Sequence, residues 1–176
     1  MIIIDNKEKA VDILLEQKPL VIFYNNSEWG PRALGNRSIL FDSRNPDAKN
    51  IVNKFKKREW WRPLAGTILL EHCHKYFDLG TLKESPYMSF AVQAKEKAIK
   101  EVPAIVHVDN TCRIQTLKEQ DNKPYYDLIS CFYKKTNVPI LLNTSFNLAG
   151  LPIVENEYFL EYTIKNSEFK YIYKPK

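Results

Sequence analysis

The stretch that decides the fold is Pro139-Ile140-Leu141-Leu142, which is followed at once by Asn143-Thr144-Ser145-Phe146-Asn147. A run of apolar residues without alternation is typical of a strand that is covered on both faces. Polar residues directly after such a strand lie at its carboxyl end, where the ligands of open α/β sheets gather. The stretch therefore predicts a buried strand with a binding site at its end.

The segments on either side of this strand alternate between helical and extended patterns. Helices are predicted at 7–16, from Pro46 onward, at 71–77, from Pro124 onward and at 157–164. Further strands are predicted at 20–24, 37–41, 64–70, 87–93, 102–108, 112–117 and 169–173. The runs 102–108 and 112–117 flank an Asp109-Asn110 turn and are predicted to form a hairpin. Mixed helices and strands of this kind favour an α/β (α+β) fold with a twisted, mixed open sheet flanked by helices.

Composition sets limits on what this chain is. Its 176 residues suit one domain, 1–176, and 44% hydrophobic with 27% charged residues matches a globular protein rather than a disordered or coiled-coil one. No apolar run approaches the roughly 20 residues that span a bilayer, and no signal peptide is apparent. Three cysteines without a C-x-x-C motif indicate a reducing compartment. We therefore expect a cytoplasmic protein that does not bind membranes.

The charge balance points to anionic ligands. Lys and Arg number 26 and Asp and Glu number 21, which gives a net charge of +5. An excess of this size is compatible with nucleic acid and equally with small phosphorylated molecules. The positions of the cations must decide between them.

Two basic segments stand out. The first is Glu28-Trp29-Gly30-Pro31-Arg32-Ala33-Leu34-Gly35-Asn36-Arg37-Ser38, a rigid loop that would bring Arg32 and Arg37 near an anion, or else a surface turn with arginines bound to carboxylates. The second is Lys54-Phe55-Lys56-Lys57-Arg58-Glu59-Trp60-Trp61-Arg62-Pro63. It fits a solvated helix face or a single-stranded nucleic-acid platform, but it leads into a buried strand, which places Arg58 and Arg62 at a helix-to-strand junction.

Other polar groups are less specific. The segment 143–147 offers hydroxyl and amide groups but no acid or base strong enough for hydrolysis, and it could also be a turn that caps its own backbone. His107 and Asp109 are predicted to lie on one side of a strand that Arg113 continues. His72-Cys73-His74 lacks the further ligands of a metal site, so none is predicted there.

Taken together, these motifs resemble one family. The runs E-W-G-P-R-A-L-G-N-R-S-I-L, K-K-R-E-W-W-R-P-L-A, S-P-Y-M, H-V-D-N-T-C-R-I-Q-T and P-I-L-L-N-T-S-F-N-L-A-G-L-P-I-V resemble, in order, the C-terminal half of the nodulation-type and antibiotic O-carbamoyltransferases. That half is a YrdC-like domain. Lys56-x-Arg58 and Ser145-x-Asn147 are similar to the K-x-R and S-x-N signatures of the wider YrdC and Sua5 group.

The resemblance implies an enzyme that makes carbamoyl-adenylate from ATP and carbamoyl phosphate, with Mg²⁺ accompanying the nucleotide. A separate Kae1-like partner would then transfer the carbamoyl group to an acceptor hydroxyl, and nucleic acid enters only as a possible acceptor. The implied catalytic residues are Lys56, Arg58, Arg113 and Ser145. The implied substrate-binding and nucleotide-binding residues are Arg32, Arg62, Met88, Asn143 and Asn147, with no metal ligand in the chain.

Two alternatives stay open at this point. One is a threonylcarbamoyl-adenylate synthase of transfer RNA modification, which shares the same signatures. The other is a module that binds nucleotides or nucleic acid without chemistry, because the transferase domain of the family is not in this sequence. Aromatic residues at Trp29, Trp60 and Trp61 are candidates for a partner surface. The sequence does not identify the acceptor.

Overall fold

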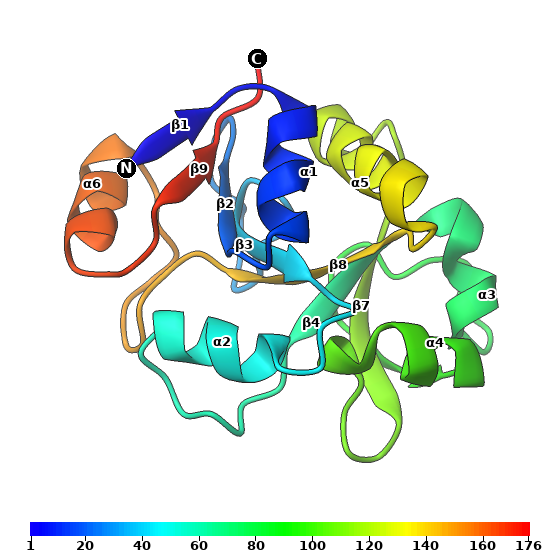
Figure 1. The fold of residues 1–176 in the computed structure, drawn as a ribbon. Coiled ribbons are helices and arrows are strands. Elements are labelled where there is room, and N and C mark those ends of the chain that lie inside the picture. Colours follow the sequence, from blue (N-terminus) through cyan, green and yellow to red (C-terminus); the bar gives the residue numbers. More distant parts are fainter.

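The protein is built around one mixed, open sheet, and the computed structural model describes residues 1–176 of it (Figure 1). The sheet has nine strands in the order β1-β9-β2-β3-β8-β4-β7-β6-β5. The expected architecture, a mixed sheet flanked by helices, is therefore confirmed.

The elements alternate along the chain much as the sequence patterns indicate. The strands are β1 (Ile2–Ile4), β2 (Leu20–Phe23), β3 (Arg37–Asp42), β4 (Ala65–Leu69), β5 (Phe77–Asp78), β6 (Ala91–Ala94), β7 (Thr111–Leu117), β8 (Ile140–Ser145) and β9 (Tyr171–Tyr173). The α-helices are α1 (Lys7–Leu15), α2 (Ala48–Phe55), α3 (Cys73–Tyr76), α4 (Glu96–Glu101), α5 (Lys123–Thr136) and α6 (Glu157–Lys165). Short 3-10 turns lie at Leu70–His72 and Pro103–Ile105.

Strand β8 occupies the middle of the sheet. It pairs antiparallel with β3 on one edge and with β4 on the other, and β4 in turn runs parallel to β7. Ile140, Leu141 and Leu142 have no exposed surface, which confirms the prediction of a strand covered on both faces. The strand continues to Ser145, so Asn143 and Ser145 belong to the sheet itself rather than to a loop after it.

Two helices cover the middle of the sheet. α1 packs against β3, β2 and β9, α5 packs against β4 and β8, and the two helices lie side by side (Figure 1). The burial of Tyr125, Leu128, Ile129 and Phe132 on α5 follows the helical spacing predicted for this segment. One contiguous core of 42 buried residues results. No helix is long and apolar enough to cross a membrane.

The predicted hairpin of 102–108 with 112–117 is wrong. Residues 103–105 form a 3-10 turn after α4, a helix that the sequence analysis did not predict. Strand β7 pairs instead with β4 and β6. The expected tight turn is present, since His107 N–H donates to Thr111 O at 2.8 Å and Asn110 has a φ of +60°. The β-propensity of Val102 and Ile105 is overridden because Pro103 starts a turn and both side chains are buried.

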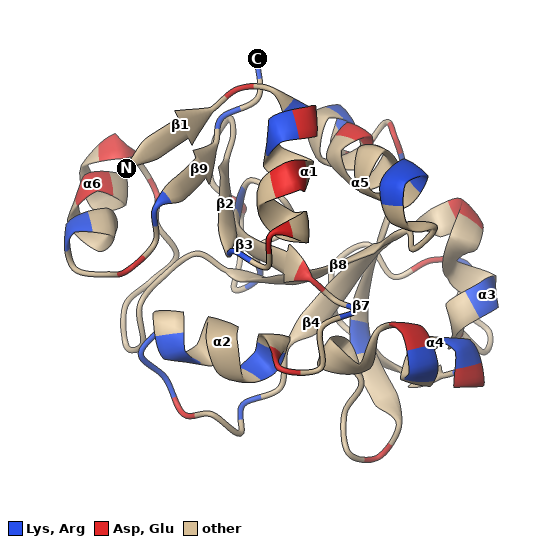
Figure 2. Ribbon diagram, viewed as in Figure 1, with Lys and Arg blue, Asp and Glu red and all other residues tan.

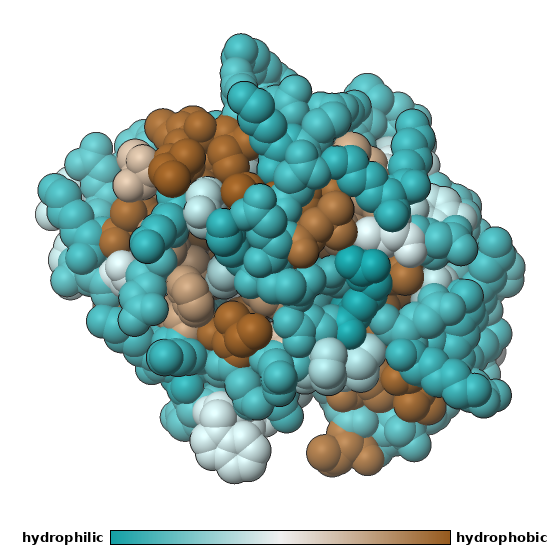
Figure 3. Space-filling model, viewed as in Figure 1, coloured by the Kyte–Doolittle hydropathy of each residue, from teal (hydrophilic) through white to brown (hydrophobic).

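The two ends of the chain meet at one edge of the sheet. Strand β1, which the sequence analysis did not predict as a strand, pairs parallel with β9 (Figure 1). Ile2 and Ile3 remain 51% and 55% exposed, and Figure 3 shows a hydrophobic patch over this strand. An edge strand of only three residues gives little surface for pairing with another chain.

Gly35, in the 24–36 loop between β2 and β3, packs against Tyr125 of helix α5. It adopts a φ of +111°, and a Cβ built on it would lie 2.2 Å from Cδ1 of Tyr125. Tyr125 is itself fully buried and cannot move aside. The loop therefore reaches its position only with a glycine at this point.

We predict that Gly35→Ala lowers the free energy of unfolding by more than about 2 kcal/mol, because it adds a steric clash to the backbone strain. Gly30→Ala is the matched control, since Gly30 has a φ of +105° and open space around it. It should cost about 1 kcal/mol. Urea unfolding of both variants measures the difference, and equal losses would show that the contact with Tyr125 is unimportant.

Candidate functional site

An open hollow lies where β8 ends and where β4 and β7 begin, with about 550 Å³ of empty space when the solvent at its mouth is included. This is the end of β8 at which the sequence predicts a binding site. Six of the residues predicted for that site line the cavity, namely Arg32, Arg58, Met88, Arg113, Asn143 and Ser145. They come from five separate segments of the chain, so only the tertiary structure brings them together.

The 24–36 loop that carries Arg32 is organised by one carboxylate. Glu28 Oε1 accepts hydrogen bonds from the backbone N–H groups of Leu34 and Asn36 at 2.7 Å and from that of Arg37 at 3.1 Å. Three backbone donors on one charged oxygen make a strong local anchor. The loop is thereby held in a compact turn, with Arg32 facing the cavity.

Arg37 does not join Arg32 at the cavity, contrary to the expectation from the sequence. Its guanidinium is buried and donates to the backbone carbonyls of Tyr24, Asn25 and Glu155 at 2.7 to 3.1 Å. It also lies 3.7 Å from the ring centroid of Phe23. Burial lowers the pKa of Arg37. Because its donors are occupied by carbonyl groups, Arg37 links the residues that follow β2 to the segment before α6 and has no donor left for a ligand.

Buried polar side chains of the sheet form the floor beneath the loop. Asn143 Nδ2 donates to Thr67 Oγ1 at 3.0 Å and to Ala33 O at 3.3 Å, and Gln115 Nε2 donates to Leu34 O at 2.9 Å. Strands β4, β7 and β8 thus all contribute to positioning the loop. Asn143 Oδ1 is buried and has no partner in the protein. Because this oxygen has no accessible surface, Asn143 supports the floor and does not present an acceptor to the cavity.

Arg58 is positioned by a residue that the sequence analysis missed. Asn53, fully buried on α2, accepts from Arg58 Nε at 2.5 Å and donates to the carbonyls of Trp60 and Arg62 at 3.0 Å. Burial and the nearby Arg62 lower the pKa of Arg58 to about 10. A buried asparagine on an otherwise apolar helix face was the only sequence signal for this role.

Lys56 lies behind Ser145 rather than in the cavity. Its ammonium nitrogen contacts Ser145 O and lies 2.9 Å from Asn147 Oδ1 and 3.3 Å from Ser145 Oγ. Ser145 Oγ in turn donates to Asn147 Oδ1 at 2.6 Å. Burial lowers the pKa of Lys56 well below its usual range, and the charges of Arg58 and Arg62 lower it further. The K-x-R and S-x-N signatures therefore meet in one hydrogen-bonded group.

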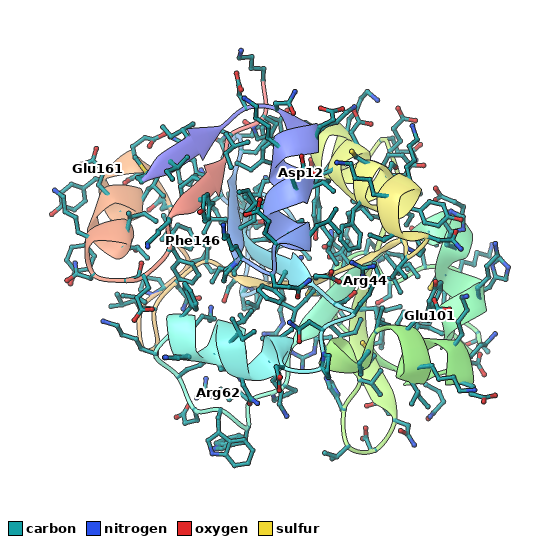
Figure 4. All side chains as sticks on the ribbon, viewed as in Figure 1. Asp12, Arg44, Arg62, Glu101, Phe146 and Glu161 are labelled. Carbon is teal, nitrogen blue, oxygen red and sulfur yellow. The ribbon has the colours of Figure 1, made fainter.

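Arg62 is the predicted site residue that lies furthest from this arrangement. It is half exposed and pairs with Glu59 at 2.9 Å, on the loop between α2 and β4 (Figure 4). Figure 2 shows several basic positions around the end of α2 and along this loop. Arg58 and Arg62 thus both lie at the helix-to-strand junction, as predicted, but only Arg58 lines the cavity.

His107 is a cavity residue to which the sequence analysis assigned no role. Its ring lines the wall and lies 3.4 Å from both Leu64 O and Thr111 Oγ1. It lies in the turn before β7, not in a strand. The sequence signal that could have identified His107 as a site residue was its position at the start of the motif H-V-D-N-T-C-R-I-Q-T, residues 107–116.

The cavity lining is strongly cationic. Three arginines and one histidine contribute to it, and none of its 13 residues carries a carboxylate. No group of three or more histidine, cysteine, aspartate or glutamate side chains could hold a metal ion elsewhere either. Guanidinium groups facing one hollow suit the oxygens of phosphate groups. The lining of the cavity therefore suits an anionic ligand.

Comparison with known proteins gives the family. Residues 11–173 match the model for "Carbamoyltransferase C-terminus". The chain belongs to this family. It is 47% identical over 133 residues to nodulation protein NolO of Bradyrhizobium diazoefficiens, covering 74% of this chain and 24% of that protein. It is 39% identical over 138 residues to nodulation protein U of Sinorhizobium fredii, covering 78% of this chain and 24% of that one. The chain therefore spans about a quarter of the length of these relatives.

Solved structures share the fold at low sequence identity. HypF in its phosphate- and nucleotide-bound form superimposes with a TM-score of 0.66 and 17% identity, over 98% of this chain and 25% of that one. A Sua5 variant from P. abyssi gives a TM-score of 0.63 and 11% identity, over 99% of this chain and 49% of that one. The chain thus has the YrdC-like fold that its sequence motifs implied.

We predict that Arg37→Leu lowers the free energy of unfolding by about 3 kcal/mol, since it leaves several buried carbonyl groups without donors. Arg32 lies on the loop just before Arg37 and is exposed, so Arg32→Leu should change the free energy of unfolding by less than about 0.5 kcal/mol. Thermal and urea unfolding separate the two. Similar stabilities for both variants would contradict the structural role of Arg37.

Proposed function

We propose that this carbamoyltransferase-family chain forms carbamoyl-adenylate from ATP and carbamoyl phosphate. The observation that carries the proposal is the convergence of Arg32, Arg58, Arg113 and Ser145 on one cavity without a carboxylate. In the reaction, carbamoyl phosphate first reacts with water and gives carbamate and phosphate; a carbamate oxygen then attacks the α-phosphorus of ATP and pyrophosphate leaves. Negative charge builds on the phosphate oxygens, and fixed cations lower the barrier to this step.

The two sides of the cavity suit different parts of the substrates. Arg58 and Ser145, beside the basic loop after α2, would hold the oxygens of the triphosphate. Arg32 and Arg113 would hold the α-phosphate or the phosphate of the carbamoyl donor. Met88, which is 4% exposed, supplies an apolar contact for the nucleotide or the acyl group.

Asn143 supports the floor of the site from beneath its surface. The residue is fully buried, and its amide nitrogen donates to Thr67 Oγ1 and Ala33 O, which holds the 24–36 loop over the sheet. We therefore assign Asn143 to the support of the cavity and the contacts with the carbamoyl group to the arginines and Ser145, which line the hollow.

Lys56, Asn147 and Arg62 act from outside the lining. Lys56 and Asn147 fix the Ser145 hydroxyl by direct hydrogen bonds. Arg62 lies at the end of the loop that carries Arg58 and would reach the terminal phosphates only by leaving Glu59. We therefore assign Arg62 a smaller share of triphosphate binding than Arg58.

The acceptor step belongs to a different protein surface. We propose that a Kae1-like partner receives the carbamoyl-adenylate, because the relatives are about four times as long as the matched segment. Trp29, Trp60 and Trp61 are 102%, 70% and 58% exposed and lie within two residues of the lining residues Pro31, Arg58 and Pro63, so they are the proposed contacts.

The proposal is tested by ATP–pyrophosphate exchange with purified protein. Exchange should require Mg²⁺ and either carbamoyl phosphate or the carbamate that forms in ammonium bicarbonate, and it should not be supported by threonine with bicarbonate. Exchange with threonine and bicarbonate alone would instead favour a threonylcarbamoyl-adenylate synthase. Nucleotide binding by calorimetry without any pyrophosphate release would favour a binding module.

We predict that Arg58→Ala and Arg113→Ala each reduce the exchange rate about 100- to 1,000-fold, because each removes a fixed cation from the reacting phosphates. Lys54→Ala is the matched control, since Lys54 is an exposed cation in the last turn of α2 that does not line the cavity. The exchange rate of Lys54→Ala should stay within about twofold of the wild-type rate. A normal exchange rate in Arg58→Ala would reject the assignment.

A further inference from the structure

Ser145 and Lys56 form a pair whose geometry goes beyond phosphate binding. The hydroxyl of Ser145 belongs to a residue of the cavity wall, and the amine of Lys56 lies 3.3 Å behind it. Lys56 is only 1% exposed and is reached from the cavity through Ser145. An amine that serves only to attract anions would gain more by facing them directly.

The surroundings of Lys56 favour its neutral form. The charged groups that act on it are Arg58 and Arg62, both cationic, and no carboxylate compensates for its burial. These effects hold the pKa of Lys56 well below its usual range. A neutral amine carries a lone pair and can therefore accept a proton.

The hydrogen bonds around the amine suit a proton acceptor. A neutral Nζ has two N–H donors, which match the acceptors Ser145 O and Asn147 Oδ1. Its lone pair is then free to accept a proton from Ser145 Oγ, 3.3 Å away, once that hydroxyl rotates from Asn147 Oδ1 toward the amine. Asn147 Oδ1 lies within 2.9 Å of Nζ and 2.6 Å of Ser145 Oγ, so it orients both groups. A nucleophile, a base and a group that orients them are the parts of a serine–lysine catalytic dyad.

The cavity wall would present a carbamoyl group to this hydroxyl. Ser145 lines the cavity together with the three arginines. A carbamoyl phosphate whose phosphate is bound by these arginines would bring its carbonyl carbon beside Ser145 Oγ. The cavity arginines would hold the phosphate that leaves.

We propose that Ser145 is a nucleophile that accepts the carbamoyl group from carbamoyl phosphate, with Lys56 as its general base. The choice of carbamoyl phosphate as donor rests on the proposed function. The dyad thus supplies the carbamate that the adenylation step consumes, before ATP takes part.

The reaction balances in two steps. Ser145 Oγ forms a bond to the carbamoyl carbon, its proton passes to Lys56 Nζ, and the bond from that carbon to the phosphate oxygen breaks. Hydrogen phosphate leaves with the proton from Lys56. Water then attacks the carbamate ester on Ser145, and Lys56 takes a proton from the water and returns one to Oγ. The products are carbamate and phosphate, with one proton released to solvent.

The dyad is tested without ATP. Purified protein incubated with radiolabelled carbamoyl phosphate should release phosphate and carry a carbamoyl ester on the peptide that contains Ser145, detected by mass spectrometry after acid quenching. Potassium cyanate is the control reagent, because carbamoyl phosphate decomposes to cyanate in water. An ester that forms equally fast with cyanate at the concentration so produced would come from that side reaction and would overturn the transfer. Absence of the ester together with ATP-dependent phosphate release would overturn the dyad.

Variants separate nucleophilic catalysis from simple binding. Ser145→Ala should lose the ester and reduce ATP-free phosphate release about 100- to 10,000-fold. Ser145→Cys should retain a covalent adduct as a thiocarbamate. Lys56→Met, which keeps the buried volume, should lose the ester, and circular dichroism verifies its fold. Ser89→Ala, an exposed hydroxyl elsewhere in the chain, should behave as wild type. Ester formation at the normal rate in Lys56→Met would overturn the role of the base.

A carbamate-supply experiment distinguishes failure of the dyad from failure of the proposed function. In ammonium bicarbonate, carbamate forms in solution and bypasses the first step. The ATP–pyrophosphate exchange rate of Ser145→Ala should then be at least tenfold higher than its rate with carbamoyl phosphate. No rescue, with wild-type exchange intact, would show that Ser145 acts only in binding ATP. No exchange in wild type from either donor would reject the proposed function instead.

Discussion

Strand β8 has to satisfy two opposing requirements, and the site follows from how it does so. Its backbone is paired on both edges, so the strand is buried, yet its last residues carry amide and hydroxyl groups. Buried polar groups without partners are costly, and the structure supplies partners from every segment nearby. Asn143 donates a hydrogen bond to the backbone of the 24–36 loop. Ser145 Oγ accepts one from Lys56 and donates one to Asn147. The polar end of one buried strand thereby gathers the pieces of the cavity.

The cations of the site are held by neutral groups. Arg58 is fixed by the amide of Asn53, and Lys56 by carbonyl and amide oxygens. Carboxylates act elsewhere, as Glu28 does when it closes the loop through backbone N–H groups. Had carboxylates paired with the cavity arginines, they would compete with the phosphates of a ligand. The repulsion among unpaired cations is then relieved when an anion binds.

The motifs at 28–38 and 54–63 are both basic, yet their arginines have different roles. Arg32 and Arg58 face the cavity, Arg37 ties loops together from within, and Arg62 pairs with Glu59 near the surface. Spacing along a loop does not show which way each side chain points, because loop backbones follow neither helical nor strand periodicity. The misplaced strand at 102–108 has a related cause, since local β-propensity is weaker than tertiary packing.

The sequence by itself determined the mixed fold, the central strand at 140–142 and the end of that strand where polar groups gather, because these follow from local periodicity. It also pointed to Arg32, Arg58, Met88, Arg113, Asn143 and Ser145 through motif resemblance, and all six line the cavity. Only the tertiary structure decided that Lys56 lies behind Ser145 and that Asn53 holds Arg58. Ser145 is 89 positions from Lys56 in the chain, and contacts at such separation are set by the packing of α2 and β8 rather than by any local pattern.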